Sequence, residues 1–237
     1  MNIFPAIDLY DGKAVRLYKG DYRQMTVYSD NPVSVALDFA AAGAKFVHIV
    51  DLEGAKEGTT PNFEVVRAIK NACGLFCEIG GGIRTMEVID RYLNAGIDRV
   101  ILGTAAVTQK DFVREAVAKY QDRIAVGADI KDGYIAVKGW TETSKLTIEN
   151  FCALMQQIGV QTLICTDISK DGAMMGTNLS LYRYLSQKFS MQIIASGGVS
   201  SIDDVQRLAD MKLYGAIIGK AYYTGGIDLR RAIEVAT

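Results

Sequence analysis

The chain has 237 residues, of which 49% are hydrophobic, and α/β barrels often use about 200–250 residues as one domain. Its net charge is −1 and it has no basic block, which argues against nucleic acid as a partner. No apolar run approaches the ~18 residues of a membrane span, and the charge at Asp8 comes too early for a signal peptide, so we expect a cytoplasmic protein that does not bind membranes.

The predicted elements alternate between short β-rich runs and helical patterns. In chain order they are strand Ile3–Asp8, helix Pro32–Gly43, strand Phe46–Asp51, helix Asn62–Asn71, strand Leu75–Ile79, helix Met86–Ala95, strand Arg99–Leu102, helix Asp111–Tyr120, strand Ile124–Asp129, helix Thr147–Ile158, strand Thr162–Asp167, helix Leu179–Lys188, strand Gln192–Ser196, helix Ile202–Ala209, strand Tyr214–Ile218 and helix Gly226–Val235. Eight strands that alternate with helices at this length favour a single (β/α)8 TIM barrel over an open doubly wound sheet.

An internal repeat supports the barrel. The sequence Gly81-Gly82-Ile83 recurs 116 residues later as Gly197-Gly198-Val199, and Asp51 recurs at the same spacing as Asp167. Four strands that match four strands predict two half-barrels, roughly residues 1–120 and 121–237, within one domain. Every repeated motif follows a strand, at the end of the barrel where loops carry functional groups.

Glycine pairs after strands predict two phosphate-binding sites. Gly-Gly lets the backbone approach a ligand closely, and amides at the next helix N-terminus can bind an anion. A single pair would more often be an ordinary turn, but here each pair has a second glycine on the next strand. The predicted phosphate-binding residues are Gly81, Gly82, Gly103 and Thr104 in one site, and Gly197, Gly198, Gly219 and Lys220 in the other. Two such sites on opposite sides of a barrel imply a ligand with a phosphate at each end.

Two aspartates are the candidate catalytic groups. Asp8 and Asp129 each close an apolar strand and are 121 residues apart, as are Asp11 and Asp132 in the Asp-Gly pairs that follow. We interpret Asp11 and Asp132 as turn residues. For Asp8 the sequence suggests no structural partner, and two partly desolvated aspartates can divide general-acid and general-base work.

The four cysteines argue against a metal site. They contain no Cys-x-x-Cys pattern, and the chain has only one histidine, His48. We therefore expect reduced thiols, no metal and an activity that survives treatment with a chelator. A lone histidine in an apolar strand is usually a satisfied core residue, yet its position in the repeat predicts that His48 faces inward, one layer below Thr166.

Five motifs together resemble one enzyme family over the whole chain. They are Phe4–Arg16, His48–Ala55, Gly80–Arg84, Val137–Trp140 and Thr166–Gly172. This combination closely resembles the phosphoribosylformimino-aminoimidazole carboxamide ribonucleotide isomerases, the Amadori-type aldose-ketose isomerases of histidine biosynthesis. The resemblance implies a (β/α)8 barrel built from two halves, a substrate with a phosphate at each end, and no metal or organic cofactor.

The resemblance also implies roles for individual residues. Asp8 would be the general base that takes a proton from the second carbon of the opened sugar, and Asp129 the general acid that protonates the ribose ring oxygen. Arg84, Trp140, Thr166 and Asp171 match positions that hold or order the substrate. The chain departs from the family's usual pattern at Ala173, where threonine is common, so a hydroxyl contact there is not expected.

Other interpretations remain open. Trp140 could be surface packing on a long loop, and Arg84 could pair with a surface acid. The cyclase subunit of imidazole glycerol phosphate synthase is a sister barrel, but it typically has Cys-Leu-Asp-Val where this chain has Ala6–Leu9. A bifunctional enzyme that also isomerises phosphoribosylanthranilate, and a non-catalytic phospho-sugar-binding barrel, are the remaining alternatives. The expected partner is the bisphosphorylated substrate alone, bound by a monomer.

Overall fold

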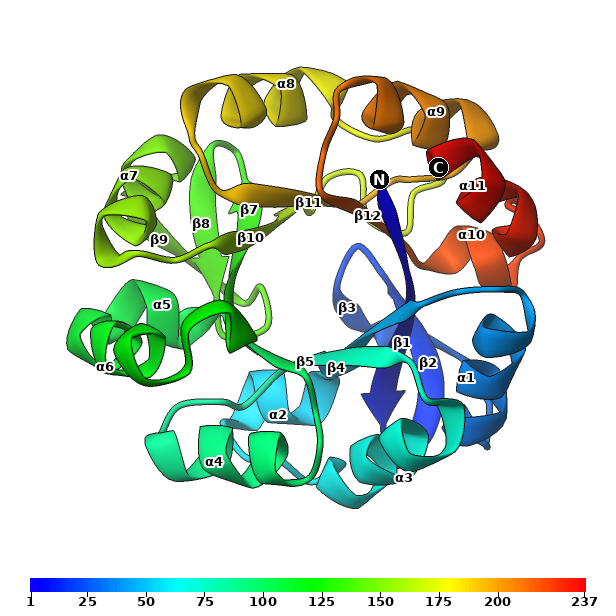
Figure 1. The fold of residues 1–237 in the computed structure, drawn as a ribbon, viewed down its shortest axis with the longest axis horizontal. Helices are drawn as coiled ribbons and strands as arrows, with labels where there is room; N and C mark the ends of the chain where they lie inside the picture. The colour runs from blue at the N-terminus through cyan, green and yellow to red at the C-terminus, as the bar shows by residue number, and fades with distance from the viewer.

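The computed structural model describes residues 1–237 and contains a closed barrel of parallel strands (Figure 1). The barrel strands are β1 (Asn2–Tyr10), β4 (Phe46–Asp51), β5 (Phe76–Gly80), β6 (Arg99–Leu102), β7 (Ile124–Lys131), β10 (Thr162–Asp167), β11 (Gln192–Ser196) and β12 (Gly215–Ile218). Each pairs with the next along the chain, β12 pairs with β1, and the β7–β10 pairing completes the ring. The predicted (β/α)8 barrel is confirmed.

Helices form a ring outside the strands, as Figure 1 shows. They are α1 (Pro32–Ala41), α3 (Phe63–Cys73), α4 (Met86–Asn94), α6 (Lys110–Tyr120), α7 (Ile148–Ile158), α8 (Leu179–Lys188), α9 (Ile202–Asp210) and α11 (Leu229–Ala236). The main core of 55 buried residues lies between these helices and the strands, and a smaller cluster of seven lies inside the barrel. None of the helices is long and apolar enough to cross a membrane.

Helix starts follow from local capping. In α9 the Ser201 side chain accepts from the Asp204 backbone N–H, while the Asp204 carboxylate accepts from the Ser201 N–H, which completes a capping box. Asn178 caps α8 through the Leu181 N–H in a similar way. At the other end, α7 stops at Gly159, whose left-handed φ of 96° suits glycine.

Two antiparallel extensions project from the carboxyl ends of opposite strands. After β1 come β2 (Lys13–Tyr18) and β3 (Asp21–Ser29), and after β7 come β8 (Tyr134–Val137) and β9 (Glu142–Thr147). Both begin with a two-residue Asp-Gly turn in which the aspartate and the glycine have positive φ. The interpretation of Asp11 and Asp132 as turn residues is therefore confirmed, whereas β3 and β9 were not predicted.

Several short elements were also missed from the sequence. These are helices α2 (Leu52–Glu57), α5 (Thr104–Thr108) and α10 (Lys220–Tyr223), and the single 3-10 turn η1 (Gln121–Arg123). The first three of these follow barrel strands, so they border the same end of the barrel as the predicted site. Each is too short to show a helical pattern of apolar residues in the sequence.

Strand register places the candidate aspartates opposite each other. Asp8 is at the level of Val50 on β4, and Asp129 is at the level of Thr166 on β10. Strands β1 and β7 are separated by three strands on one side of the ring, β4, β5 and β6, and by three on the other. Side chains alternate along a strand, so His48 and Glu78, two positions before Val50 and Gly80, lie one layer deeper in the barrel.

Candidate active site

A cavity of about 210 Å3 opens at the carboxyl ends of the barrel strands. It is lined by every residue that the sequence indicated for the site: Asp8, Asp129, Gly81, Gly82, Gly103, Thr104, Gly197, Gly198, Gly219, Lys220, Arg84, Trp140, Thr166 and Asp171. These residues come from both halves of the chain and all eight barrel strands or the loops after them contribute to the lining. The fold thus brings the whole predicted set to one place, at the end of the barrel where such sites occur.

Asp8 has a partner that the sequence analysis did not identify. Arg16, on the neighbouring strand β2, donates from Nη1 to Asp8 Oδ2 at 2.8 Å and from Nη2 to the Ala6 carbonyl at 2.9 Å. Both side chains of the ion pair are nearly buried, with exposed fractions of 11% for Arg16 and 13% for Asp8. The expectation that Asp8 stands without a structural partner is therefore wrong, and its negative charge is stabilised by an adjacent guanidinium.

Asp129 lies in a different environment. Burial raises the pKa of its carboxyl, while interactions with Trp140, Thr166 and His48 oppose that rise. No lysine or arginine forms an ion pair with Asp129. A buried carboxyl without a cationic partner holds a proton more readily than an ordinary aspartate does, which is the property that a general acid needs.

Asp171, in the loop after β10, is a third carboxyl at the site. Burial raises its pKa to about 6, with the nearby charges of Asp8 and Asp129 adding to the shift and those of Arg16 and Lys220 opposing it. The backbone N–H of Asp171 donates to the carbonyls of Asp167 and Ile168, so the loop turns back toward the end of its strand. A carboxyl that titrates close to neutral pH can both donate and accept hydrogen bonds in this cavity.

The glycine pairs are required by the fold as well as by any ligand. Gly81, Gly82, Gly197 and Gly198 all have positive φ, between 75° and 107°. A Cβ at Gly81 would collide with the Asp51 carbonyl oxygen, and one at Gly197 would lie 2.6 Å from that of Asp167. The two collisions recur at the same 116-residue spacing as the glycines, so each pair lets its loop pass close beneath the preceding strand end.

In each predicted phosphate site, the glycine on the next strand directly precedes a short helix. Gly103 precedes α5 and Gly219 precedes α10, and neither position supplies a side-chain cap. A Cβ at Gly103 would meet no atom within 4 Å, whereas one at Gly219 would lie 2.8 Å from Arg16 Nη2. The uncapped amides leave donors available at each strand end beside a glycine pair, as an anion site requires.

Thr104 and Lys220, which follow these glycines, have different contacts. Thr104 Oγ1 accepts a hydrogen bond from the Lys138 N–H at 2.9 Å. Lys220 Nζ donates to the Gly172 carbonyl at 3.0 Å and lies 5.3 Å from the centre of the Tyr18 ring. Each residue thus ties its strand end to a neighbouring loop that borders the cavity, and Lys220 brings a positive charge to the second site.

Trp140 and Arg84 both pack against glycines across the cavity. Trp140 has a positive φ of 69° and is the third of three consecutive residues with left-handed backbone, after Lys138 and Gly139. Its indole occupies the space beside Gly20, in the turn between β2 and β3, where a Cβ would collide with the ring. The Arg84 guanidinium occupies the space beside Gly58 and forms no ion pair, so the alternative that Arg84 pairs with a surface acid is wrong.

His48 faces inward as predicted, one layer below the aspartates. It lines the cavity, and its Nδ1 lies 2.6 Å from Glu78 Oε1 on the adjacent strand. Glu78 in turn accepts two hydrogen bonds from Arg99. Neither Glu78 nor Arg99 was noticed in the sequence, because they are 21 residues apart and belong to no motif that marks them as partners.

Asp51 and Asp167 hold the chain together beside the cavity. Asp51 accepts from Asn62 Nδ2 at 2.9 Å, and Asp167 accepts from Asn178 Nδ2 at 2.7 Å. The two asparagines are also 116 residues apart, so the repeat already contained this signal. These aspartates therefore join each strand end to the start of the helix that follows it.

No group of three or more histidine, cysteine, aspartate or glutamate side chains is arranged to hold a metal ion. The cysteines Cys73, Cys77, Cys152 and Cys165 are all free thiols. The polar groups that reach the cavity are carboxyls, backbone amides, hydroxyls, one imidazole and cationic side chains. Such a set can bind anions and move protons between oxygen and carbon atoms.

Comparison with known proteins agrees with this geometry. Residues 2–228 match the family model described as histidine biosynthesis protein. The chain is 51% identical to a protein of Lactococcus lactis subsp. cremoris, over 100% of this chain and 97% of the relative. Identity is 48% to a protein of Brachyspira hyodysenteriae, over 100% and 99%, and 49% to one of Oceanobacillus iheyensis, over 99% and 98%.

All three relatives carry the name 1-(5-phosphoribosyl)-5-((5-phosphoribosylamino)methylideneamino) imidazole-4-carboxamide isomerase. The similarity extends over essentially the full length of both partners, and it includes the strand-end motifs that line the cavity. The chain belongs to the histidine biosynthesis protein family.

Proposed function

We propose that the chain is an intramolecular aldose-ketose isomerase that acts on the compound named in its relatives. The reaction is an Amadori rearrangement, in which the phosphoribosylformimino-aminoimidazole carboxamide ribonucleotide aminoaldose becomes its aminoketose. Substrate and product have the same composition, so every proton taken from the substrate is matched by one returned to it. The observation that carries the proposal is the placement of Asp8 and Asp129 on opposite strands, between two glycine sites.

The two glycine sites would hold the ends of the substrate. Gly81 and Gly82 with Gly103 and Thr104 form one anion site, and Gly197 and Gly198 with Gly219 and Lys220 form the other. They follow β5 and β6 on one side of the ring, and β11 and β12 on the other. A ligand with two phosphates would therefore span the cavity, and its sugar would lie between the aspartates.

The proton transfers follow from the surroundings of the two carboxyls. Asp129, whose pKa is raised by burial, would deliver its proton to the ribose ring oxygen and open the ring. Asp8, paired with Arg16, would then take the proton from the second carbon and form the enolamine. A positioned general acid or base contributes ~10²–10⁴-fold to a rate. Asp8 would then return its proton to the first carbon, while the hydroxyl on the second carbon loses its proton and becomes the ketone. That proton would restore Asp129, so both carboxyls end the cycle as they began it.

The remaining predicted residues would order the substrate. Thr166 lies beside Asp129 in strand register, where its hydroxyl can orient the acid. Asp171 lies near both aspartates and Arg16, and the Trp140 indole and Arg84 guanidinium border the cavity from two other loops. We assign Trp140 to stacking on the imidazole ring and Arg84 to contact with the substrate. The reaction as written uses no metal or organic cofactor.

The test is an activity assay of the purified chain with both isomerase substrates, the aminoaldose and phosphoribosylanthranilate. Formation of the aminoketose from the first substrate alone supports the proposal. Turnover of both substrates would show the bifunctional enzyme instead. Tight binding of the aminoaldose without any turnover would identify a non-catalytic phospho-sugar-binding barrel and contradict the proposal.

A further inference from the structure

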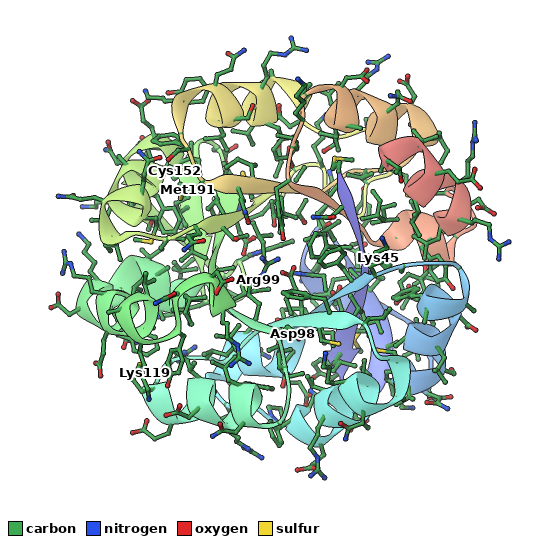
Figure 2. All side chains as sticks on the ribbon, in the orientation of Figure 1. Lys45, Asp98, Arg99, Lys119, Cys152 and Met191 are labelled. Atoms are coloured by element: carbon green, nitrogen blue, oxygen red, sulfur yellow. The ribbon has the colours of Figure 1, made fainter.

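A row of charged side chains crosses the inside of the barrel beneath the cavity. His48, Glu78 and Arg99 stand on three consecutive strands, and strand register pairs His48 with Glu78 and Glu78 with Arg99. Glu78 is completely buried and Arg99 is only 3% exposed. Figure 2 shows Arg99 within the ring of strands, whereas Lys119 lies at the outer rim. Burying such charges is costly unless they are paired, so their arrangement calls for a physical reason.

The two oxygens of Glu78 are divided between its neighbours. Oε1 lies 2.6 Å from His48 Nδ1, whereas Oε2 accepts from Arg99 Nε at 2.9 Å and from Arg99 Nη2 at 2.5 Å. Burial favours the neutral form of Glu78, but its contacts with His48 and Arg99 outweigh that effect and lower its pKa. Glu78 is therefore a carboxylate, and a carboxylate only accepts hydrogen bonds, so Nδ1 of His48 carries a proton.

The other nitrogen of the His48 ring faces the cavity. Nε2 makes no hydrogen bond with the protein, and it is not among the buried polar atoms that lack a partner. His48 lines the same cavity as Asp129. With the Nδ1 proton directed at Glu78, the Nδ1–H tautomer of the ring presents Nε2 as a hydrogen-bond acceptor at the cavity floor, one layer below the two aspartates.

We propose that Glu78 is a positioning residue, which fixes the Nδ1–H tautomer and the ring orientation of His48 so that Nε2 accepts a hydrogen bond from a hydroxyl of the substrate sugar. This inference rests on the proposed function, because that function places the substrate sugar between Asp8 and Asp129, directly above His48. Arg99 completes the arrangement: it neutralises Glu78 and keeps Oε2 occupied, so that Oε1 alone serves the histidine.

The substitution Glu78→Gln tests this assignment because it preserves shape and reverses one hydrogen bond. Arg99 can only donate, so the new amide must turn its oxygen to Arg99 and its NH2 group to His48. Nδ1 then has to accept, and the ring is forced into the Nε2–H tautomer. A single substitution thus converts the acceptor at the cavity floor into a donor without removing His48 itself.

His48 is the only histidine in the chain, so nitrogen-15 labelling of histidine produces one ring signal set that needs no assignment. We expect the wild-type protein to show the Nδ1–H tautomer and Glu78→Gln to show the Nε2–H tautomer. With the aminoaldose substrate, kcat of Glu78→Gln should fall about 10- to 100-fold, equal to about 1.4–2.8 kcal/mol. KM should change less than about threefold, because the phosphates are held elsewhere.

Asp98→Asn is the control. Asp98 precedes Arg99 but accepts from Lys70 Nζ and from the Cys77 N–H, outside the cavity lining. Its substitution also removes one partner of an ion pair, and it should leave both the tautomer and kcat unchanged.

Three outcomes would overturn the proposal. They are a wild-type Nε2–H tautomer, which is measurable even if Glu78→Gln does not fold, a tautomer that Glu78→Gln leaves unchanged, and an inverted tautomer with unchanged kcat. An inactive wild type would contradict the proposed isomerase instead.

Discussion

In the first half of the chain Asp8 pairs with Arg16, whereas in the second half the position that matches Arg16 is Val137. The two hairpins have the same register, since Leu9 pairs with Ala14 and Ile130 with Ile135. Only one of the two equivalent aspartates therefore forms an ion pair with a cation of its own hairpin. Duplicated strands place two carboxyls symmetrically, and the difference between Arg16 and Val137 gives them different surroundings. Asp8 has a buried cationic partner, whereas Asp129, whose pKa is raised by burial, has none.

The second difference between the halves lies in the anion sites. Thr104 follows Gly103 in the first, and Lys220 follows Gly219 in the second. A Cβ at Gly103 would point into open space, but one at Gly219 would crowd Arg16. The backbone of the two sites is repeated, while their charge and the room around them are not. The site that contains Lys220 is thus physically coupled to the Asp8–Arg16 pair, and the site that contains Thr104 is not.

Replacing each aspartate by asparagine should produce the largest effects. We expect Asp8→Asn and Asp129→Asn each to lower kcat by about 10²–10⁴-fold, with little change in affinity for the product. The two variants should differ in stability. Asp8→Asn leaves the Arg16 cation buried without a counter-charge, and breaking a buried pair costs about 3–5 kcal/mol, so Asp8→Asn should be the less stable of the two. Steady-state kinetics, calorimetric titration with product and urea unfolding measure these quantities.

The control for both is Asp132→Asn, in an exposed turn whose φ of 52° asparagine tolerates. It should be silent in all three measurements. Wild-type turnover by Asp8→Asn would remove Asp8 from the mechanism, and equal stability of the two active-site variants would show that Arg16 does not depend on Asp8.

Asp171 should make stability depend on pH. Its folded pKa of about 6 lies above the ordinary value of 3.8, so the folded protein binds more protons than the unfolded chain between these values. Stability contributed by this group is therefore present below about pH 4 and is lost as the pH rises through about 6. A shift of about two units corresponds to about 3 kcal/mol.

The substitution Asp171→Asn should remove this dependence. Urea unfolding should show the variant more stable than the wild type by up to about 3 kcal/mol at about pH 8, and equally stable at about pH 4. A difference that is the same at both pH values would contradict the raised pKa. Asp11→Asn, in the exposed turn of the first hairpin, is the control and should leave the pH dependence unchanged.

Two glycine substitutions in the first anion site should have different effects, one on ligand binding and one on stability. Gly103→Ala places a methyl group in open space beside the predicted phosphate and should weaken binding of a bisphosphate product about tenfold without loss of stability. Gly82→Ala should instead destabilise the fold, because its Cβ would collide with the Thr59 carbonyl oxygen. Calorimetric titration and urea unfolding distinguish the two. A monophosphate fragment that binds as tightly as the bisphosphate would show that the site does not have two ends.

The sequence predicted the barrel well because its strands are apolar runs with clear ends. β4, β6, β10 and β11 have the predicted bounds. It missed β3 and β9, none of whose residues is fully buried and which are held by pairing with β2 and β8 instead of by burial. An apolar pattern cannot report a strand that is stabilised in that way.

The site was predicted as a set of residues but not as a set of interactions. All the predicted site residues line one cavity, because they lie at the ends of barrel strands or in the loops that follow them. Arg16 belonged to the first motif, but its pairing with Asp8 depends on the hairpin between them. Glu78 and Arg99 are 21 residues apart and become neighbours only through the register of β5 and β6. Contacts across strands require the register, which a single sequence does not state.

The two asparagines that hold the strand ends should also differ in their effects. Asn62 donates to Asp51 and to Glu53, and its Oδ1 accepts from the Gly12 N–H in the first hairpin. Asn178 donates to Asp167, and its Oδ1 caps α8 and accepts from Ser180. Asn62 is 3% exposed, so Asn62→Ala leaves its buried partners without a hydrogen bond. Asn178 is more accessible, so water can replace its hydrogen bonds.

We therefore expect Asn62→Ala to cost about 2–3 kcal/mol of unfolding free energy and Asn178→Ala about 1–2 kcal/mol, with kcat reduced only for Asn62→Ala. The reason for the kinetic difference is that Asn62 anchors the turn between the strands that carry Asp8 and Arg16, whereas Asn178 forms no hydrogen bond with the second hairpin. Urea unfolding and steady-state kinetics of both variants measure the two effects. A larger loss of stability in Asn178→Ala, or equal kinetics in both, would show that the asparagine of the first half does not support its hairpin.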